Sequence, residues 1–351
     1  HQGIHGVPRS EVHEVMTKKR GLGVGSMFYG IGYGFNRADI GSAYIEMADD
    51  GTTTVYSGAC DMGQGIMTVV AQVAAEVVGA NIDTIRVVAA DTTSTPDAGP
   101  TSGSRATFVQ GIAVHEAASD LHDQLMQTAA GMFECEKDEL EAHNGDVYLK
   151  DANSPIASLA EVAARVHLLG GRCASWGWHD NSTADVDPAT SQGDAYASYG
   201  WASQLAEVEV DTETGHVKVL KIVSATDAGK AINPVAVEGQ IQGGAAMGVG
   251  YALYEQHILD EGVPRTDSLA FYLVPTSMDV PEIQCEIVEV YDPKGPFGAK
   301  GIAEPATVPT TPAILNAIYD AIGIRITDTP ATPERVFQAI QEARARGEFK
   351  D

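Results

Sequence analysis

Basic residues are scarce in this sequence, and that scarcity excludes nucleic-acid-binding proteins as a class. The 351 residues include 22 Lys and Arg against 48 Asp and Glu, which gives a formal net charge of −26 at pH 7. A protein that binds a phosphate backbone needs a basic surface, and an anionic membrane surface also attracts basic segments. We therefore expect no nucleic-acid partner and no membrane partner.

Cysteines and long apolar runs are also few. The cysteines, Cys60, Cys135, Cys173 and Cys285, lie far apart and include no C-x-x-C pair. They therefore predict neither a disulfide framework nor an iron–sulfur or zinc motif. No apolar run reaches the roughly 20 residues that span a bilayer, and no signal peptide is visible. These absences favour a cytoplasmic protein whose side chains hold no metal directly.

The composition that remains is typical of a globular protein. Hydrophobic residues make up 44% of the chain and charged residues 20%, and this length suffices for two or three domains with their own cores. Polar residues 1–20 predict an N-terminal arm, and the turn formers in 176–203 predict a linker. We expect the rest of the chain to form a first subdomain over 21–175 and a second over 204–351.

A hairpin pattern followed by a helix pattern occurs twice. Residues 42–59 alternate about a turn at 49–51, and apolar residues then recur at helical spacing as far as Gly79. Residues 204–227 alternate in the same way, and a glycine-rich helix pattern follows over 238–255. Strands and helices in this order favour an α+β fold with two hairpin-plus-helix subdomains over a doubly wound sheet.

Glycine-rich segments raise the question of a bound cofactor. Residues 21–35, GLGVGSMFYGIGYGF, miss the G-x-G-x-x-G register, so we expect a buried strand there and not a dinucleotide loop. In residues 61–68, DMGQGIMT, Gly63 and Gly65 allow the backbone to approach a ligand closely. Gln64 between them can both donate and accept a hydrogen bond. The helix that follows would offer free N–H groups to an anion.

Residues 99–107, GPTSGSRAT, repeat this arrangement, with Arg105 available to bind a phosphate. Two such helix starts together predict a large phosphorylated cofactor. Each of them taken alone also fits an ordinary capped helix.

Glu304 stands just before an apolar helix. A carboxylate at that place can simply stabilise the helix dipole, which contributes under about 1 kcal/mol when the group is exposed. Its neighbours Gly301, Ile302, Ala303 and Pro305 are small or apolar, as in the floor of a pocket, where a carboxylate can act as a general base. The residues alone leave both interpretations open.

Four stretches in this order resemble the second molybdenum-binding domain of the xanthine dehydrogenase and aldehyde oxidase family of molybdenum hydroxylases. The resemblance runs from about residue 20 to the C-terminus and implies the α+β fold of that family. The stretches are DMGQGIMTVVAQVAAEVVG, DTTSTPDAGPTSGSRATFVQGIAV, DAGKAINPVAVEGQIQGGAAMGVGYALYEQ and GAKGIAEPATVPTTPAILNAIYDAIG.

The resemblance assigns roles to residues by their position. Glu304, in K-G-x-x-E-P, would be the base that takes a proton from hydroxide or water on molybdenum. Gln64 would form a hydrogen bond near the ligands of the metal. Ser102 and Gly103 would pack against the metal centre, where larger side chains would collide with it. Contacts to the pterin dinucleotide would come from Gly63, Gly65, Ser104, Arg105, Lys300 and Gly301.

Two tyrosines and two departures from the family pattern complete this set. Tyr33 and Tyr29 fall where the family places an aromatic ring against a flat substrate, and core packing is the alternative for both. Many relatives have glutamine in place of Met247, so one hydrogen bond to the cofactor would be missing here. Many also have glycine in place of Ala303, and the added methyl group would shift the loop only slightly.

The first molybdenum domain of the family has no counterpart in this sequence. That arrangement resembles bacterial members, such as nicotinate dehydrogenase, whose molybdenum subunit is split into two polypeptides. The implied cofactor is molybdopterin with molybdenum, usually the cytosine dinucleotide form in bacteria. The implied partners are a large molybdopterin subunit, an iron–sulfur subunit with two [2Fe–2S] clusters and an FAD subunit.

The implied reaction is hydroxylation of an aromatic N-heterocycle, nicotinate-like or purine-like, with oxygen from water. Three alternatives stay open at this point. The chain could belong to an aromatic acyl-CoA reductase, to a CO dehydrogenase-type enzyme, or to a scaffold that kept the fold without catalysis.

Overall fold

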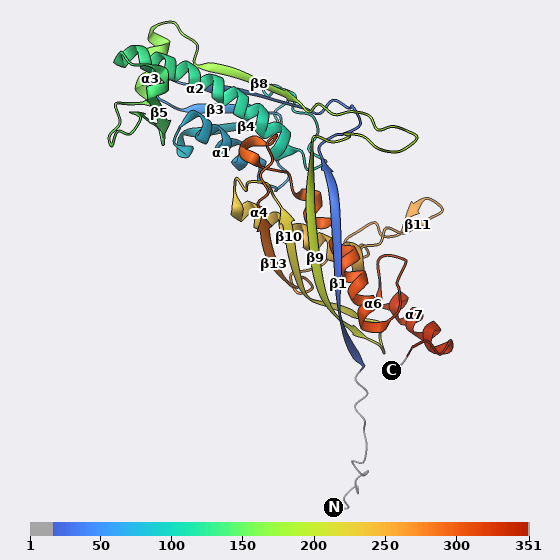
Figure 1. Cartoon of the computed structure of the whole chain (residues 1–351). Helices are drawn as coiled ribbons and strands as arrows, with labels where there is room; N and C mark the ends of the chain where they lie inside the picture. The colour runs from blue at the N-terminus through green and yellow to red at the C-terminus, as the bar shows by residue number, and fades with distance from the viewer. Residues whose placement is uncertain (1–16, 350–351) are drawn as a thin grey trace, which may run out of the picture.

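Two four-stranded sheets organise the chain (Figure 1). The computed structural model describes residues 17–349. The first sheet has the strand order β4-β3-β2-β8, and helices α1 and α2 pack against it. The bounds of these elements are β2 (Ile40–Met47), β3 (Thr53–Ser57), β4 (Ile85–Ala89), β8 (Ala174–Asp180), α1 (Ile66–Val78) and α2 (Gly111–Phe133).

The hairpin and the helix expected from residues 42–79 are confirmed. Strands β2 and β3 pair antiparallel. Helix α1 ends where Gly79 adopts a left-handed φ of 80°, as glycine commonly does just past a helix. Aliphatic side chains of α1 such as Val70 and Val73 are buried in one cluster with Leu121 of α2. This cluster is the core of the first subdomain.

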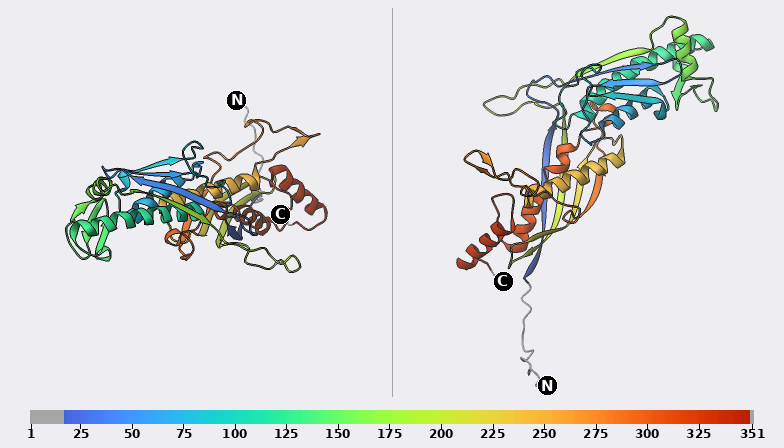
Figure 2. Two further views of the ribbon diagram at one scale, coloured as in Figure 1. Left: turned by 90° about the horizontal axis from the view of Figure 1, so that it is seen from above. Right: turned by 180° about the vertical axis from the view of Figure 1, so that it is seen from behind.

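The second sheet has the strand order β1-β9-β10-β13, and helices α4 and α6 pack against one face of it. Seen from behind, α4 lies across the strands (Figure 2), and α6 runs along β1, where Gly21 and Gly25 face Ala321 and Ala313. Side chains buried between sheet and helices, among them Val208, Val249 and Ile318, form a second core. The bounds are β1 (Lys18–Ile31), β9 (Ser198–Asp211), β10 (Val217–Asp227), β13 (Glu282–Val288), α4 (Pro234–Leu253), α6 (Thr310–Ile322) and α7 (Pro333–Ala345).

Strand β1 lies in the second sheet, which differs from the boundaries expected from the sequence. It pairs antiparallel with β9 along its whole length. Residues 18–20 of the expected arm are therefore strand, and residues 21–31 leave the expected subdomain 21–175. Residues 1–16 of the arm lie outside the described residues. A pairing between segments so distant in sequence leaves no local pattern, so periodicity could not reveal it.

The expected linker over 176–203 is also shorter in the structure. Its two ends lie in β8 and β9, and residues 181–197 connect these strands across the two sheets. The mixture of helices and sheets agrees with the α+β prediction. Within residues 17–349, no helix is both long and apolar enough to cross a bilayer. The remaining elements are η1 (Ile82–Thr84), η2 (Ala106–Gln110), η3 (Lys137–Glu139), β5 (Leu140–His143), β6 (Asp146–Leu149), β7 (Ala157–Ser158), α3 (Leu159–Leu168), β11 (Leu259–Asp260), β12 (Val263–Pro264), η4 (Pro296–Gly298) and α5 (Ala303–Thr307).

Only one face of β1 is buried, so the expectation of a buried strand is half right. Leu22, Val24 and Phe28 are each more than half exposed on the face away from the helices. On the other face, Gly23 allows α6 to lie directly against the strand. A Cβ on Gly23 would lie 2.1 Å from the backbone nitrogen of Ala317. The glycines of this strand therefore serve helix packing.

We expect Gly23→Ala to destabilise the second subdomain by roughly 1–3 kcal/mol, because α6 must move away from the sheet to admit the methyl group. Gly131→Ala is the matched control. Gly131 lies inside α2 with no atom within 4 Å of its Cβ position, so alanine should stabilise that helix by about 1 kcal/mol. Thermal unfolding measures both variants. If Gly23→Ala were as harmless as Gly131→Ala, α6 would not depend on this glycine.

Candidate active site

Glu304 lies in the first turn of α5, a short helix that Gln204 fixes to the second sheet. The Gln204 side chain is buried; its Nε2 donates to the carbonyl oxygen of Ala306 over 2.8 Å. The Oε1 of Gln204 accepts from Thr310 Oγ1 over 2.6 Å. Both ends of the buried amide are therefore satisfied. This bonding holds α5, and Glu304 with it, against β9 and the start of α6.

The carboxylate of Glu304 faces the turn 102–105, which comes from the first half of the chain. The Gly103 amide donates to its Oε1 over 3.1 Å, and the Ser104 hydroxyl donates to its Oε2. The Glu304 amide donates to Ser104 Oγ over 3.0 Å. A carboxylate that only capped its own helix would accept from N–H groups of that helix. These contacts therefore favour a site between the two subdomains.

Two tyrosines lie beside the Glu304 carboxylate and the turn 102–105. Tyr29 is near the end of β1, and Tyr33 is just beyond it. The Tyr33 hydroxyl lies 2.5 Å from Ser102 Oγ. Burial, followed by the charge of Glu304 and a hydrogen bond to it, raises the pKa of Tyr29 to about 12. Tyr29 thus remains a protonated phenol near neutral pH, next to the Glu304 carboxylate. The structure brings both tyrosines to the candidate site.

Arg105 lies inside the protein, which differs from the phosphate contact that the sequence suggested. Its Nε donates to the Asp39 carboxylate. Its two terminal nitrogens donate to backbone carbonyls, those of Ile40, Ala98 and Pro100. The Arg105 and Asp39 side chains are only 3% and 0% exposed. Arg105 therefore anchors the loop that leads into the turn 102–105, because its donors are directed at protein acceptors.

Lys300 and Gly301 also have internal partners. Lys300 Nζ lies 2.7 Å from Asp227 Oδ2, and the two side chains are 8% and 6% exposed. A Cβ on Gly301 would lie 1.5 Å from the carbonyl oxygen of Ser104, so only glycine fits there. The structure gives both residues a part in packing the Glu304 segment against its surroundings.

The loop 61–65 before α1 leaves its glycines open. Gly63 and Gly65 have φ angles of 103° and 83°, and no atom lies within 4 Å of either Cβ position. The Asp61 carboxylate accepts from the amides of Gly63, Gly65 and Met67 over 2.8, 3.4 and 3.3 Å. Asp61 therefore already occupies the amide of Met67 in the first turn of α1 and that of the N-cap Gly65.

Gln64 closes this loop on itself. Its Nε2 donates to the carbonyl oxygen of Cys60 over 2.9 Å, and its Oε1 accepts from the Met62 amide over 2.6 Å. Burial favours the neutral form of the neighbouring Asp61, but the three backbone amides outweigh it and lower the pKa of this carboxyl. If Gln64 contacted a ligand, its hydrogen bonds to Cys60 and Met62 would be replaced by hydrogen bonds to that ligand.

The open glycines fit a broad, flat ligand such as a pterin, because backbone without side chains permits close approach. Such glycines lie just before α1 and within α4. These two helices are in contact, since Asn233 at the N-cap of α4 donates to Gln72 of α1 over 3.3 Å. Met247, where many relatives have glutamine, is half exposed on α4. In the loop before α1 and in α4, the glycines with nothing within 4 Å of the Cβ position are Gly63, Gly65, Gly239 and Gly243.

Three polar residues that support the site are absent from the residues that the sequence singled out. They are Asp39, Asp61 and Gln204. Asp61 has a local signal, because Asp two residues before a glycine is typical of an Asx turn. Asp39 and Gln204 have none, because their partners Arg105 and Ala306 are distant in sequence and meet them only in the folded chain.

Comparison with known proteins gives a family match and several relatives. A family profile described as "Molybdopterin cofactor-binding domain" matches residues 6–281. The chain is 33% identical to the gamma subunit of the 6-hydroxypseudooxynicotine dehydrogenase complex of Paenarthrobacter nicotinovorans, over 92% of this chain and 40% of that protein. It is 31% identical to the xanthine dehydrogenase molybdenum-binding subunit of Escherichia coli O157:H7, over 91% of this chain and 42% of that protein.

Among solved structures, the chain is similar to quinoline 2-oxidoreductase from Pseudomonas putida 86. The TM-score is 0.83 at 28% identity, and the match covers 94% of this chain and 43% of that chain. The chain thus spans about two fifths of the length of the curated relatives it matches.

Proposed function

The chain belongs to the molybdopterin cofactor-binding family, and we propose that it forms the cofactor-binding part of a molybdenum hydroxylase acting on an aromatic N-heterocycle. One observation carries the proposal: the Glu304 carboxylate meets the turn 102–105 beside Tyr29 and Tyr33, where a proton acceptor and a flat ring would come together. Relatives named for 6-hydroxypseudooxynicotine, xanthine and quinoline support this substrate class, because each of these compounds contains an aromatic N-heterocycle.

In the proposed reaction, a ring C–H bond becomes C–OH, with oxygen from water and the release of two electrons and two protons. When bound, the molybdenum cofactor would supply the redox centre that receives the electrons. Glu304 would hold the proton removed from the water-derived oxygen, and Tyr29 would orient that carboxylate through its phenol. Tyr33 would lie against the substrate ring. The electrons would pass on to [2Fe–2S] clusters and FAD on partner subunits.

The family resemblance supports the cytosine dinucleotide form of the cofactor. The two buried cations of the site pair with Asp39 and Asp227, so neither Arg105 nor Lys300 is placed to neutralise a diphosphate. We propose that backbone amides of this chain and cationic side chains of a partner hold the phosphates instead. The Gln64 loop and the glycines of α4 would then face the pterin.

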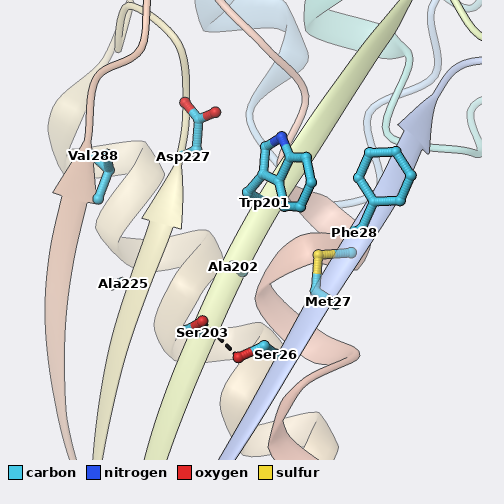
Figure 3. A pocket seen from close by; sticks show the side chains of 9 residues that line it. All are labelled: Ser26, Met27, Phe28, Trp201, Ala202, Ser203, Ala225, Asp227 and Val288. Carbon is cyan, nitrogen blue, oxygen red and sulfur yellow. Dashed lines mark hydrogen bonds between the residues drawn. The ribbon is translucent and has the colours of Figure 1, made fainter.

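The open face of the second sheet supports a large molybdopterin subunit as the principal partner. Phe28 lies 4.5 Å from both Tyr199 and Trp201 between ring centroids. Figure 3 shows Phe28, Trp201 and Val288 on the side of the sheet away from the helices, beside a groove. An apolar face of this kind marks an interaction site. The curated relatives extend well beyond the part that this chain matches. We propose that a separate subunit, corresponding to the unmatched part of those relatives, covers the face.

The segment between α4 and β13 adds a second apolar surface. Leu269, Phe271 and Met278 are exposed by 78%, 66% and 90%. Short strands β11 and β12 pair only with each other here. Side chains of this kind are expected to be buried when the proposed partner is bound.

We expect Trp201→Lys to weaken binding of the large subunit roughly 30-fold or more, because a charge would replace an aromatic side chain in a dehydrated contact. Leu168→Lys is the matched control: Leu168 is 76% exposed at the end of α3, in the first subdomain. Native mass spectrometry of the complex purified from its own source measures the partner bound to each variant. Equal retention of the partner by both variants would contradict the assignment of this face.

The proposed function is tested on the same complex. We expect stoichiometric molybdenum, and turnover of at least one of nicotinate, xanthine and quinoline with a dye as electron acceptor. In water enriched in oxygen-18, the product should carry the heavy isotope. A complex without molybdenum or turnover would favour the scaffold alternative. Oxidation of CO, or dehydroxylation of an aromatic acyl-CoA without heterocycle turnover, would favour the other two alternatives.

A further inference from the structure

We propose that Ser104 is a positioning residue whose hydroxyl holds Glu304 in place, and that this hydroxyl does not contact the cofactor. The inference rests on the proposed function, because it explains how the base in that function is oriented. It differs from the pterin contact that the sequence suggested for Ser104.

The hydroxyl of Ser104 bonds to Glu304 twice. It donates to the carboxylate Oε2, and it accepts from the Glu304 backbone amide over 3.0 Å. The neighbouring Gly103 amide donates to the other carboxylate oxygen over 3.1 Å. Two adjacent residues therefore bind both oxygens and the main chain of Glu304. With both carboxylate oxygens and the backbone amide bound, the Glu304 side chain has little rotational freedom, which is what a proton acceptor in a fixed geometry requires.

The backbone at Ser104 indicates that the side chain matters. Its φ is 52°, in the left-handed region where a residue with a Cβ is strained. Glycine would remove that strain, and glycine does occupy the preceding position, Gly103, with a φ of 64°. Strained residues persist where the surroundings over-determine them and are concentrated at functional sites. The feature that serine has and glycine lacks is the hydroxyl.

The two main chains touch at this point. A Cβ on Gly301 would lie 1.5 Å from the Ser104 carbonyl oxygen. Ser104 itself is only 8% exposed. No space remains between Ser104 and the Glu304 segment for a ligand, so a cofactor would reach the turn from the side of Ser102 and the open glycine loop. The Ser104 hydroxyl therefore bonds to Glu304 and not to the cofactor.

Two substitutions separate the hydroxyl from the backbone conformation. Ser104→Ala removes the hydroxyl and keeps the strain, whereas Ser104→Gly removes both. We expect both variants to lose about tenfold in kcat with KM within twofold of wild type, because a hydrogen bond to a charged group is lost. Molybdenum content should not change. Ser104→Gly should melt a few degrees above Ser104→Ala, because only the alanine variant retains the strain.

Amide hydrogen exchange tests the contact without relying on activity. In both Ser104 variants of the purified complex, the amide of Glu304 should exchange about fivefold faster, because its acceptor is gone. Ser191 provides the control, since it is exposed and has a φ of 54° in the loop between β8 and β9. Ser191→Ala and Ser191→Gly should leave kcat and the exchange of Glu304 unchanged.

The outcomes distinguish this inference from the proposed function. If exchange at Glu304 does not change in the Ser104 variants, the hydroxyl does not hold Glu304. If Ser104→Gly is as active as wild type while Ser104→Ala is not, Ser104 acts through the turn conformation alone, and the inference is wrong. A fall in molybdenum content would restore Ser104 as a cofactor contact. Absence of turnover in the wild type would contradict the proposed function, whereas the exchange data would still decide the contact.

Discussion

Replacing Glu304 with glutamine is expected to lower kcat about a thousandfold or more while molybdenum stays bound. Glutamine has nearly the same shape, and its amide oxygen can still accept from the Gly103 N–H group. Its NH₂ group can donate to Ser104 Oγ, because a hydroxyl oxygen can accept hydrogen bonds as well as donate one. The contacts that hold the side chain are thus retained, and only the capacity to accept a proton is lost.

The measurement is kcat and metal content of the complex carrying Glu304→Gln, with Glu161→Gln as the control. Glu161 is a carboxylate that caps a helix: its Oε2 accepts from the Ser158 amide over 2.8 Å at the start of α3. Loss of the carboxylate there should reduce stability slightly and leave turnover unchanged. Substantial turnover by Glu304→Gln would make Glu304 a structural carboxylate like Glu161, and the proposed reaction would need another base.

The parts of the fold that sequence predicts well are those with local signals. The alternating residues around Gly51 and the helical spacing that ends at Gly79 correspond to the β2–β3 hairpin and α1, because turn and cap geometry depend on adjacent residues. The partner of β1 has no such signal. The glycines of β1 suggested a buried strand, and in the structure they provide room for α6, which is formed by residues at the other end of the chain.

The candidate site divides in the same way. Family resemblance and local chemistry led to Glu304, Tyr29 and Tyr33, and the structure brings these side chains together. The two cations, Arg105 and Lys300, fit a phosphate site in the sequence, yet both are paired inside the protein. Sequence gives the charge of a side chain but not the distant carboxylate that neutralises it, so the electrostatics of a site emerge only with the fold.

The ion pair of Arg105 and Asp39 is buried, so the loss of one partner should strongly reduce the stability of the protein. Arg105→Met should destabilise the protein by roughly 3–5 kcal/mol, because it leaves the Asp39 carboxylate buried without its cation. Asp39 Oδ2 also accepts from the Tyr33 amide and from Asn181 Nδ2, each over 2.9 Å. Removal of the cation therefore affects the residues around the site as well as the ion pair. Denaturant unfolding measures the change.

Arg265→Met is the control for that experiment. The Arg265–Asp260 pair is exposed by 59% and 57%, so its loss should cost less than about 1 kcal/mol. The double variant Asp39→Asn/Arg105→Met should regain part of the stability lost by Arg105→Met, because no unpaired charge then remains buried. If Arg105→Met were no less stable than Arg265→Met, Asp39 would not depend on Arg105. The guanidinium would then be free to bind a phosphate of the cofactor, as the sequence alone suggested.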